Sequence, residues 1–382
     1  MAIADQPAQA PSGIEVAANM RDAYNRWIES QELPIHRGYF IDDVRTVEVA
    51  KWDERGCSAA FLVLAGQEGV SESRVTEIAP GATTAPVRFA LDEVVYVAEG
   101  RGLTTVWGGD GPKKTFEWQK KSMFLLPRGA TSQLSNVSGS SPARLLHVNH
   151  LPMAMHIVPD PKFYFDNAHF ESDLLYGDGS EFYSEAKAIA PPAGSRAAAM
   201  KRVLWMGNFF PDMGVWDKLH TYQERGAGGH RVGVQFAKST MWSHMSVFPS
   251  RTYKKGHRHG PGVVIIIPAG EGYSIMWPEG HDKVVVPWHE ASVFVPPNRW
   301  FHQHFNVGSN PARYLAFHAP RPGQQPAEQI QDRSGDQIEY PQEDLFIRQK
   351  FESELAARGL TSLMPEEAYR DLSYKWDYDE ED

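Results

Sequence analysis

The chain has 382 residues, a formal net charge of −10 and one cysteine, Cys57. The acidic balance argues against a general nucleic-acid or anionic-membrane surface, and no apolar run is long enough for a membrane span. A lone cysteine cannot form an internal disulfide and no secretory signal opens the chain, so we expect a cytoplasmic protein.

In chain order, the predicted elements run from a helix through many short strands to a second helix. Apolar residues at helical spacing predict a helix over 14–29, and a similar pattern before Gly359 predicts another over 341–358. Between them, short runs rich in Val, Ile, Phe and Tyr are separated by Gly and Pro, as at 263–267 and 292–296. This pattern is typical of an all-β barrel or jelly roll with a few peripheral helices.

The strand-rich region contains an internal repeat. The segment 93–107 aligns without a gap to 263–277, at a constant offset of 170 residues that also pairs Trp118 with Trp288 and Asn136 with Asn306. A repeat of this length predicts two copies of one domain. The predicted organisation is an N-terminal arm and helix at 1–40, a first barrel at 41–158, a linker at 159–200, a second barrel at 201–322, and a C-terminal helical extension with an acidic tail at 323–382.

Histidines at strand spacing predict a metal site in the second copy. On a strand, His257 and His259 would point to one face, and His302 on a later strand can complete a set of three. Imidazole suits zinc, copper, iron and nickel, and three protein ligands leave coordination positions open for chemistry. The first copy cannot repeat this site, because its three corresponding residues are Val87, Phe89 and Ser132.

These segments resemble the two sequence motifs of the cupin superfamily. Pro297 to Asn306 resembles Pro-x-Gly-x-x-His-x-x-x-Asn, with Arg299 at the Gly position. The segment from His257 resembles His-x-His-x(3,4)-Glu-x(6)-Gly, with Val263 at the Glu position. The resemblance implies two tandem cupin jelly-roll barrels, a metal-free first one and a metal-binding second one. It also implies a three-histidine site without the usual carboxylate.

Within the cupins, the His-Arg-His segment and the Trp-Phe-His-Gln-His segment are most similar to gentisate and hydroxynaphthoate ring-cleaving dioxygenases. The resemblance implies an Fe(II) dioxygenase that uses O2 to cleave a hydroxylated aromatic acid or a related anionic bidentate substrate, with Mn, Zn or Ni also possible. That family usually holds its metal in the N-terminal barrel, so the substrate can differ here. We also expect a homo-oligomer with no nucleic-acid or membrane partner.

The neutral ligand set favours an anionic substrate, because three imidazoles leave the full charge of the metal uncompensated. His304 shares the strand parity of His302, which makes it a candidate base, hydrogen-bond donor or fourth ligand. Arg299 either contacts the substrate anion or points to solvent. We interpret Lys254 and Lys255 as a solvated turn. Further candidate substrate contacts are Lys255, Gln303, Trp300 and Tyr273.

Two other classes of function stay open. One is a metal-dependent lyase, isomerase or decarboxylase; oxalate decarboxylases are also bicupins, but they carry the Glu that Val263 replaces here. The other is a non-enzymatic small-molecule-binding cupin, which a complete histidine triad disfavours. Oxygen uptake would separate the dioxygenase from both.

Overall fold

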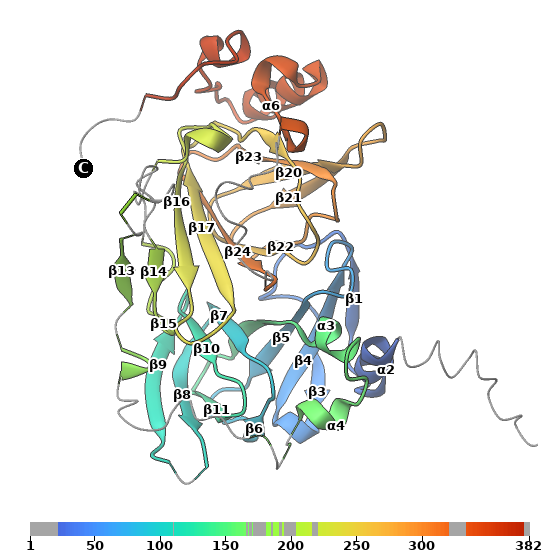
Figure 1. Ribbon diagram of the computed structural model, residues 1–382, viewed down its shortest axis with the longest axis vertical. Helices are drawn as coiled ribbons and strands as arrows, with labels where there is room; N and C mark the ends of the chain where they lie inside the picture. The colour runs from blue at the N-terminus through green and yellow to red at the C-terminus, as the bar shows by residue number, and fades with distance from the viewer. Residues whose placement is uncertain are drawn as a thin grey trace, which may run out of the picture.

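The computed structural model describes residues 22–109, 111–165, 167, 170, 181–184, 186–190, 193–194, 204–215, 221–320 and 334–377. The chain folds into two jelly-roll barrels in tandem, stacked along the long axis of the molecule (Figure 1). This confirms the predicted all-β class with few helices. The first half of the helix predicted at 14–29 lies outside the described residues.

The first barrel consists of two facing sheets. One sheet has the order β1-β4-β5-β12-β7-β10-β15, with β3 beside β4, and the other has the order β6-β11-β8-β9. The strands are β1 (Ile35–Gly38), β3 (Ala50–Trp52), β4 (Cys57–Leu64), β5 (Glu72–Ile78), β6 (Val87–Arg88), β7 (Glu93–Glu99), β8 (Arg101–Trp107), β9 (Lys114–Gln119), β10 (Met123–Leu126), β11 (Thr131–Asn136), β12 (Ala143–Asn149) and β15 (Phe209–Phe210).

The second barrel repeats this arrangement. Its sheets have the orders β13-β14-β16-β17-β24-β19-β22-β2 and β21-β20-β23-β18-β25. The strands are β2 (Phe40–Ile41), β13 (Lys187–Ile189), β14 (Leu204–Met206), β16 (His230–Gln235), β17 (Trp242–Phe248), β18 (Gly256–His257), β19 (Val264–Ala269), β20 (Gly272–Trp277), β21 (Val284–Trp288), β22 (Val293–Phe294), β23 (Phe301–Asn306), β24 (Ala312–His318) and β25 (Gln337–Ile338).

Strand pairing crosses the predicted domain boundaries. Strand β2 pairs with β22 of the second barrel, and β15 pairs with β10 of the first, so each barrel is extended by a short strand from outside its predicted range. Val264 and Ile266 belong to a core shared by the two barrels, whereas Val263, Ile265 and Ile267 belong to the core inside the second barrel. The run 263–267 is uniformly apolar because both of its faces are buried.

The internal repeat is confirmed at the level of single hydrogen bonds. The Asn136 side chain donates to the carbonyl oxygen of Ser141 at 2.8 Å, and Asn306 donates in the same way to Asn310 at 2.9 Å. Each asparagine also donates to the last residue of an equivalent strand, Asn136 to Ile78 of β5 at 3.0 Å and Asn306 to Phe248 of β17 at 3.5 Å. Trp118 Nε1 donates to Thr104 at 3.0 Å, and its counterpart Trp288 donates to Ser274 at 3.1 Å.

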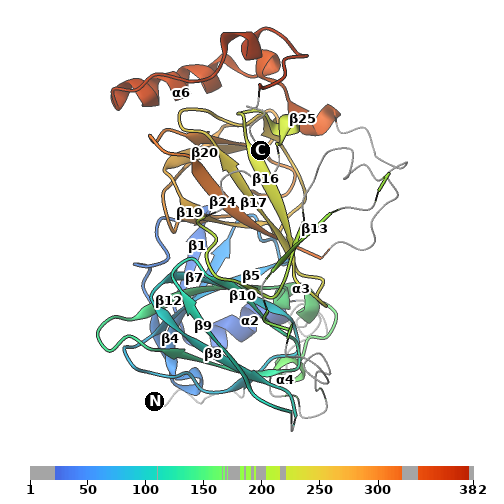
Figure 2. The same ribbon diagram turned by 90° about the vertical axis from the view of Figure 1, so that its left-hand side faces the viewer.

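The helices cover the outer ends of the barrels. The first barrel carries α2 (Ala23–Ser30), α3 (Leu151–Met155) and α4 (Pro161–Tyr164). Helix α6 (Leu345–Ala357) buries Phe351 against the outer face of the β20–β23 sheet, and Figure 2 shows it lying across the far end of the second barrel. It begins later than predicted because Pro341 belongs to the 3-10 turn η6 (Tyr340–Gln342) and Asp344 caps the helix. No helix in the described part of the chain is both long and apolar enough to cross a membrane.

Candidate metal centre

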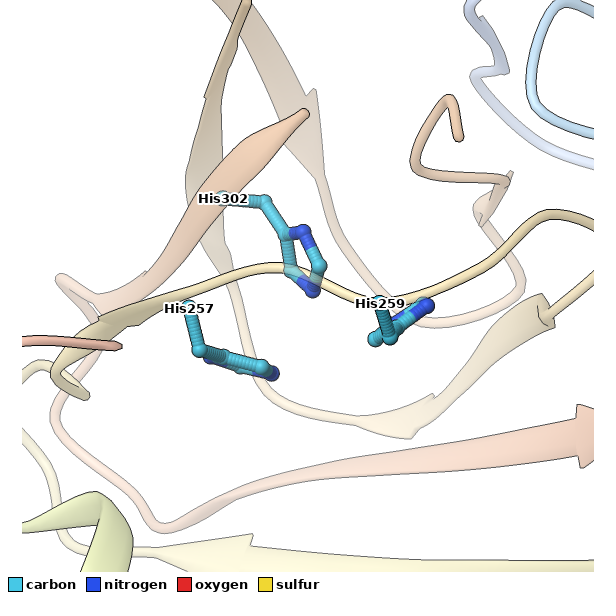
Figure 3. A group of neighbouring side chains, drawn as sticks. All are labelled: His257, His259 and His302. Carbon is cyan, nitrogen blue, oxygen red and sulfur yellow. The ribbon is translucent and has the colours of Figure 1, made fainter. Parts of the chain in front are cut away.

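Three histidine side chains meet inside the second barrel (Figure 3). His257 lies on β18 and is the register partner of His302 on β23, while His259 follows β18 by two residues. One nitrogen from each ring lies within 4.8 Å of the others. The structure therefore brings together the three residues that the sequence predicted as ligands, and metal binding itself stays a prediction.

The hydrogen bonds of the rings orient them as ligands. Each Nδ1 faces a backbone carbonyl oxygen: Lys255 for His257 at 3.2 Å, Gly260 for His259 at 2.8 Å and Trp300 for His302 at 3.1 Å. A carbonyl oxygen only accepts, so Nδ1 carries the hydrogen and Nε2 carries the lone pair that can bind a metal.

The burial of the rings also fits a metal ion. His302 Nε2 is buried and has no hydrogen-bond partner among the described residues. An orphaned buried lone pair is costly unless something binds it. Burial holds the pKa of both His257 and His302 well below the usual value, which keeps the imidazoles in the neutral form that metal binding requires. The donor set therefore fits a divalent transition metal.

The carboxylate position of the motif holds an apolar side chain. Val263 is 6% exposed and belongs to the apolar cluster inside the barrel together with Met276, the register partner of His302. No Asp or Glu joins the histidine group in the described part of the chain. The site is therefore built from neutral ligands, as the sequence indicated.

His304 lies on the same strand as His302 but outside the group of three. Its ring centre is 5.5 Å from that of His302, and its Nδ1 is 2.8 Å from the Ser274 hydroxyl. Ser274 also accepts a hydrogen bond from Trp288 Nε1 at 3.1 Å, so its hydroxyl links His304 to the strand β21. Burial lowers the pKa of His304 to about 3. His304 is thus a neutral, buried imidazole beside the triad.

Sequence reasoning missed Lys254, which it placed in a solvated turn. That interpretation was wrong, because Lys254 is fully buried. Its Nζ donates to Ser246 and lies 3.4 Å from the Tyr314 hydroxyl, whose ring centre is 5.0 Å from that of His304. Burial lowers the pKa of Lys254 to about 7. The repeat gave no signal of this burial, because Thr84, the counterpart of Lys254 in the first copy, is only half-buried.

The charges that act on the histidine rings are positive. Burial is the largest cause of the low pKa of both rings. The second cause is the positive charge of Arg225 for His257 and that of Lys254 for His304. Arg225 lies in the 3-10 turn η3 (Gln223–Arg225), which comes before the triad in the chain. Its side chain donates to Gln337 at 2.7 Å. A site that combines neutral ligands with nearby cations is electrostatically matched to an anion.

Two of the predicted substrate contacts lie on the wrong face of the sheet. Gln303 donates to the Lys254 carbonyl oxygen at 3.2 Å and to Glu343 at 3.1 Å, beneath the C-terminal extension. Tyr273 stacks on Phe305 at 4.6 Å between ring centres, under α6. Both correct the prediction, and the cause is strand alternation: their neighbours His302 and Ser274 take the inner face.

The other two predicted contacts lie at the edge of the barrel. Lys255 forms an ion pair with Glu339 at 2.5 Å, so its charge is already compensated. Trp300 is half-buried against the apolar cluster inside the barrel, with its ring centre 5.9 Å from that of Tyr39. Trp300 is also tied to the triad through its backbone, because its carbonyl oxygen faces His302 Nδ1.

Arg299 points to solvent, which is the second of the two alternatives that the sequence left open. Its side chain is 53% exposed and donates to Asp336 at 2.7 Å. Its φ of +63° matches the +70° of Gly129, which explains why the motif has glycine there: the turn is left-handed. Asp336 is also bonded by Arg258 at 3.1 Å. The functional reading of Arg299, contact with the substrate anion, is not supported.

Replacing Arg299 should therefore affect stability and not catalysis. Arg299→Gly and Arg299→Ala both lose the Asp336 ion pair, but only glycine relieves the left-handed backbone, so we expect the Gly variant to be more stable by about 1 kcal/mol. Chemical denaturation measures the difference. Both variants should keep their metal and a KM within about twofold of the wild-type value, because the side chain is a surface group. A larger rise in KM at full metal content would restore Arg299 as a substrate contact.

Fold and site together describe a protein of two jelly-roll barrels with a three-histidine cluster in the second barrel. No family model and no curated protein matches the chain. Solved structures of Bacillus subtilis oxalate decarboxylase resemble it. A deletion mutant is 13% identical, with a TM-score of 0.45 over 74% of this chain and 76% of the other.

A second structure, on the substrate binding mode of that enzyme, is 12% identical, with a TM-score of 0.46 over 75% of this chain and 78% of the other. A third, on its Mn(II) centres, is 12% identical, with a TM-score of 0.45 over the same shares. Likeness at this level assigns neither a reaction nor a metal to this chain.

Proposed function

We propose that the second barrel is the catalytic centre of a metal-dependent enzyme whose substrate is a small anion that chelates the metal through two oxygens. The observation that carries this proposal is the orientation of the triad. All three Nδ1 atoms are tied to backbone carbonyl oxygens and no carboxylate joins the group among the described residues. Such a set is preorganised to hold a divalent ion.

The residues around the triad have separable roles in this proposal. When bound, a divalent metal would act as a Lewis acid towards the substrate oxygens. His304 places a neutral imidazole beside the triad. Lys254 supplies a positive charge from the barrel interior, where it lies beside Tyr314, a ring neighbour of His304. Val263 and Met276 belong to the apolar cluster inside the second barrel and exclude water from that side of the site.

We propose Fe(II)-dependent cleavage of a hydroxylated aromatic acid by O2 as the reaction. Support comes from the sequence motifs around His257 and His302 and from the neutral ligand set, which favours an anionic bidentate substrate. In this proposal the carboxylate partner is the buried Lys254, in place of the Arg299 and Lys255 that the sequence suggested.

A second candidate is a decarboxylase, lyase or isomerase that uses Mn, Zn or Ni without consuming O2. The observation that favours it is Lys254, whose pKa of about 7 allows it to give and take a proton near neutral pH. The same residues thus serve either reaction. The two reactions differ in whether they consume O2.

One experiment separates the candidates. The protein is reconstituted anaerobically with Fe(II) or Mn(II) and screened against hydroxylated aromatic acids and small dicarboxylic acids, while O2 uptake and CO2 release are measured. O2 uptake with Fe(II), lost in His302→Ala, supports the dioxygenase. CO2 release without O2 uptake supports the second candidate. Neither activity in any loaded form would contradict an enzymatic role.

The pKa of Lys254 also predicts how stability depends on pH. Its ordinary pKa is 10.5 and burial lowers it to about 7, so between these values the unfolded chain binds more protons than the folded one. The contribution of Lys254 to the free energy of unfolding should therefore rise with pH from about 7, by on the order of 1 kcal/mol per pH unit. Below pH 7 this contribution should stay at its most unfavourable level.

Urea denaturation of metal-free wild type and metal-free Lys254→Met at pH 7, 8 and 9 measures this effect. The difference between wild type and variant isolates the lysine from all other titrating groups. Parallel stability curves for the two proteins across this range would show that Lys254 keeps its ordinary pKa.

A further inference from the structure

The first barrel contains a cavity at the place where the second barrel holds its triad. The cavity comprises about 760 Å³ of empty space, part of it open to solvent. Val87, Phe89 and Ser132, the counterparts of His257, His259 and His302, all line it. The positions that hold the metal ligands in the second barrel thus line a cavity in the first barrel.

Aromatic side chains form one wall of this cavity. Phe165 stacks on Trp27 of α2 at 4.9 Å between ring centres and on Phe89 at 5.2 Å, both at an interplanar angle of 19°. The Arg55 guanidinium lies 5.3 Å from the ring centre of Trp52 and 5.0 Å from that of Phe165. Flat, parallel rings at a cavity wall offer stacking surface to another ring.

A buried polar network closes the opposite side. Arg74 bonds Glu72 at 2.5 Å and Glu93 at 2.7 Å. His147 Nδ1 donates to Glu93 at 2.7 Å, and Thr76 bonds His147 Nε2 at 2.8 Å. Burial would raise the pKa of Glu93, but Arg74 and His147 bring it below the usual value. Two carboxylates therefore share one guanidinium, and the network has no spare positive charge for an anion.

The network leaves one donor available. Arg74 Nε is buried and has no hydrogen-bond partner among the described residues, while both Nη atoms of the same guanidinium are engaged. A neutral acceptor such as a carbonyl oxygen would satisfy this donor without adding negative charge beside Glu72 and Glu93. The remaining lining is mostly apolar, for example Ile78, Leu126 and Leu134.

We propose that the first barrel is a binding site for a neutral aromatic molecule that carries one hydrogen-bond acceptor. The aromatic wall stacks on the ligand ring and Arg74 donates to its acceptor. The two barrels then divide the recognition of small molecules by charge: the second is built for an anion at a metal, the first for an uncharged ring. This inference does not depend on the metal or on the reaction of the second barrel.

The test uses the fluorescent probe N-phenyl-1-naphthylamine, which is neutral and aromatic, on the full-length protein. Ser132→Trp fills the cavity from β11, and Ser135→Trp places the same bulk on the outward face of the same strand. We expect Ser132→Trp to weaken probe binding by about tenfold or more, and Ser135→Trp to leave it within about twofold. His302→Ala should also bind as wild type does, because it alters only the second barrel.

Ala130→Leu gives a second, smaller filling of the same cavity if Ser132→Trp does not fold, as judged by circular dichroism. It should weaken the probe by an intermediate factor. Equal binding in Ser132→Trp or Ala130→Leu and wild type would overturn the proposal, and so would loss of binding in His302→Ala, which would place the probe in the second barrel.

Two comparisons test the chemistry of the ligand. 1-Anilinonaphthalene-8-sulfonate has the same ring system as the probe and a negative charge, and we expect it to bind about tenfold more weakly. As competitors of the probe, 2-acetylnaphthalene should be about tenfold stronger than 2-ethylnaphthalene, which lacks the acceptor. Tighter binding of the sulfonate would overturn the neutral class, and equal competition by the two naphthalenes would remove the acceptor from the proposal.

Discussion

Replacing His302 by alanine should remove the bound metal and with it all metal-dependent activity. One of three ligands is lost, and the remaining two lie on a segment that no longer faces a third nitrogen. Outer hydrogen-bond partners of metal ligands already account for about 10- to 100-fold in affinity, so loss of a ligand should exceed that range. Elemental analysis after reconstitution should give about one metal per wild-type chain and a tenth of that or less in the variant.

The matched control is Ser132→Ala, at the equivalent position of the first barrel. It should leave the metal content unchanged, since the first copy has no ligand set. Two metals per wild-type chain, or an unchanged metal content in His302→Ala, would show that the triad is not the site.

The second large effect is expected at Lys254. Lys254→Met keeps the length of the side chain and removes its charge, so a buried cation is replaced by an apolar group that the surrounding rings of Phe248 and Tyr314 can pack against. Such replacements are often neutral or stabilising for the fold. If the lysine holds the substrate anion, loss of one charged hydrogen bond should lower kcat/KM by about 10- to 100-fold at unchanged metal content.

Lys255→Met is the control, because the neighbouring lysine is paired with Glu339 at the edge of the barrel. We expect it to change kcat/KM by less than about threefold. Steady-state kinetics of both variants on the substrate found by screening measure the contrast. Equal losses in the two variants, or none in Lys254→Met, would remove Lys254 from the site.

The sequence was sufficient for features that depend on local spacing. His257 and His259 lie two residues apart, and the offset of 170 residues between Gly100 and Gly270 recurs throughout the repeat. Both glycines have nearly the same φ, +98° and +99°, and a Cβ on either would lie 2.7 Å from an alanine of the neighbouring strand. Close packing of this kind constrains residue type, and so it remains visible in a single sequence.

Features that depend on distant partners could not be predicted. The burial of Lys254 is set by Ser246 and Tyr314, which come from two other strands. The partner of Arg299 is Asp336, in the C-terminal extension. Strands β2 and β15 are two residues long, too short for any periodicity to show. By contrast, the outward direction of Tyr273 follows from strand alternation and was available from the sequence.

The two copies share the hydrogen bonds that hold the barrel together, but they carry different residues at the positions of the metal site. The second has histidines where the first has Val87, Phe89 and Ser132, and the first has Glu93 where the second has Val263. The asparagine and tryptophan bonds that hold the frame are the same in both. The two copies thus share these framework bonds and differ at the positions of the metal ligands and of the motif carboxylate.

The most direct test of a metal centre in the second barrel is anomalous X-ray diffraction on crystals of the reconstituted protein, collected on both sides of the absorption edge of the added metal. We predict one peak per chain, at about 2.0–2.2 Å from the Nε2 atoms of His257, His259 and His302. A peak in the first barrel, or no peak at the triad in protein shown by elemental analysis to contain metal, would contradict this account.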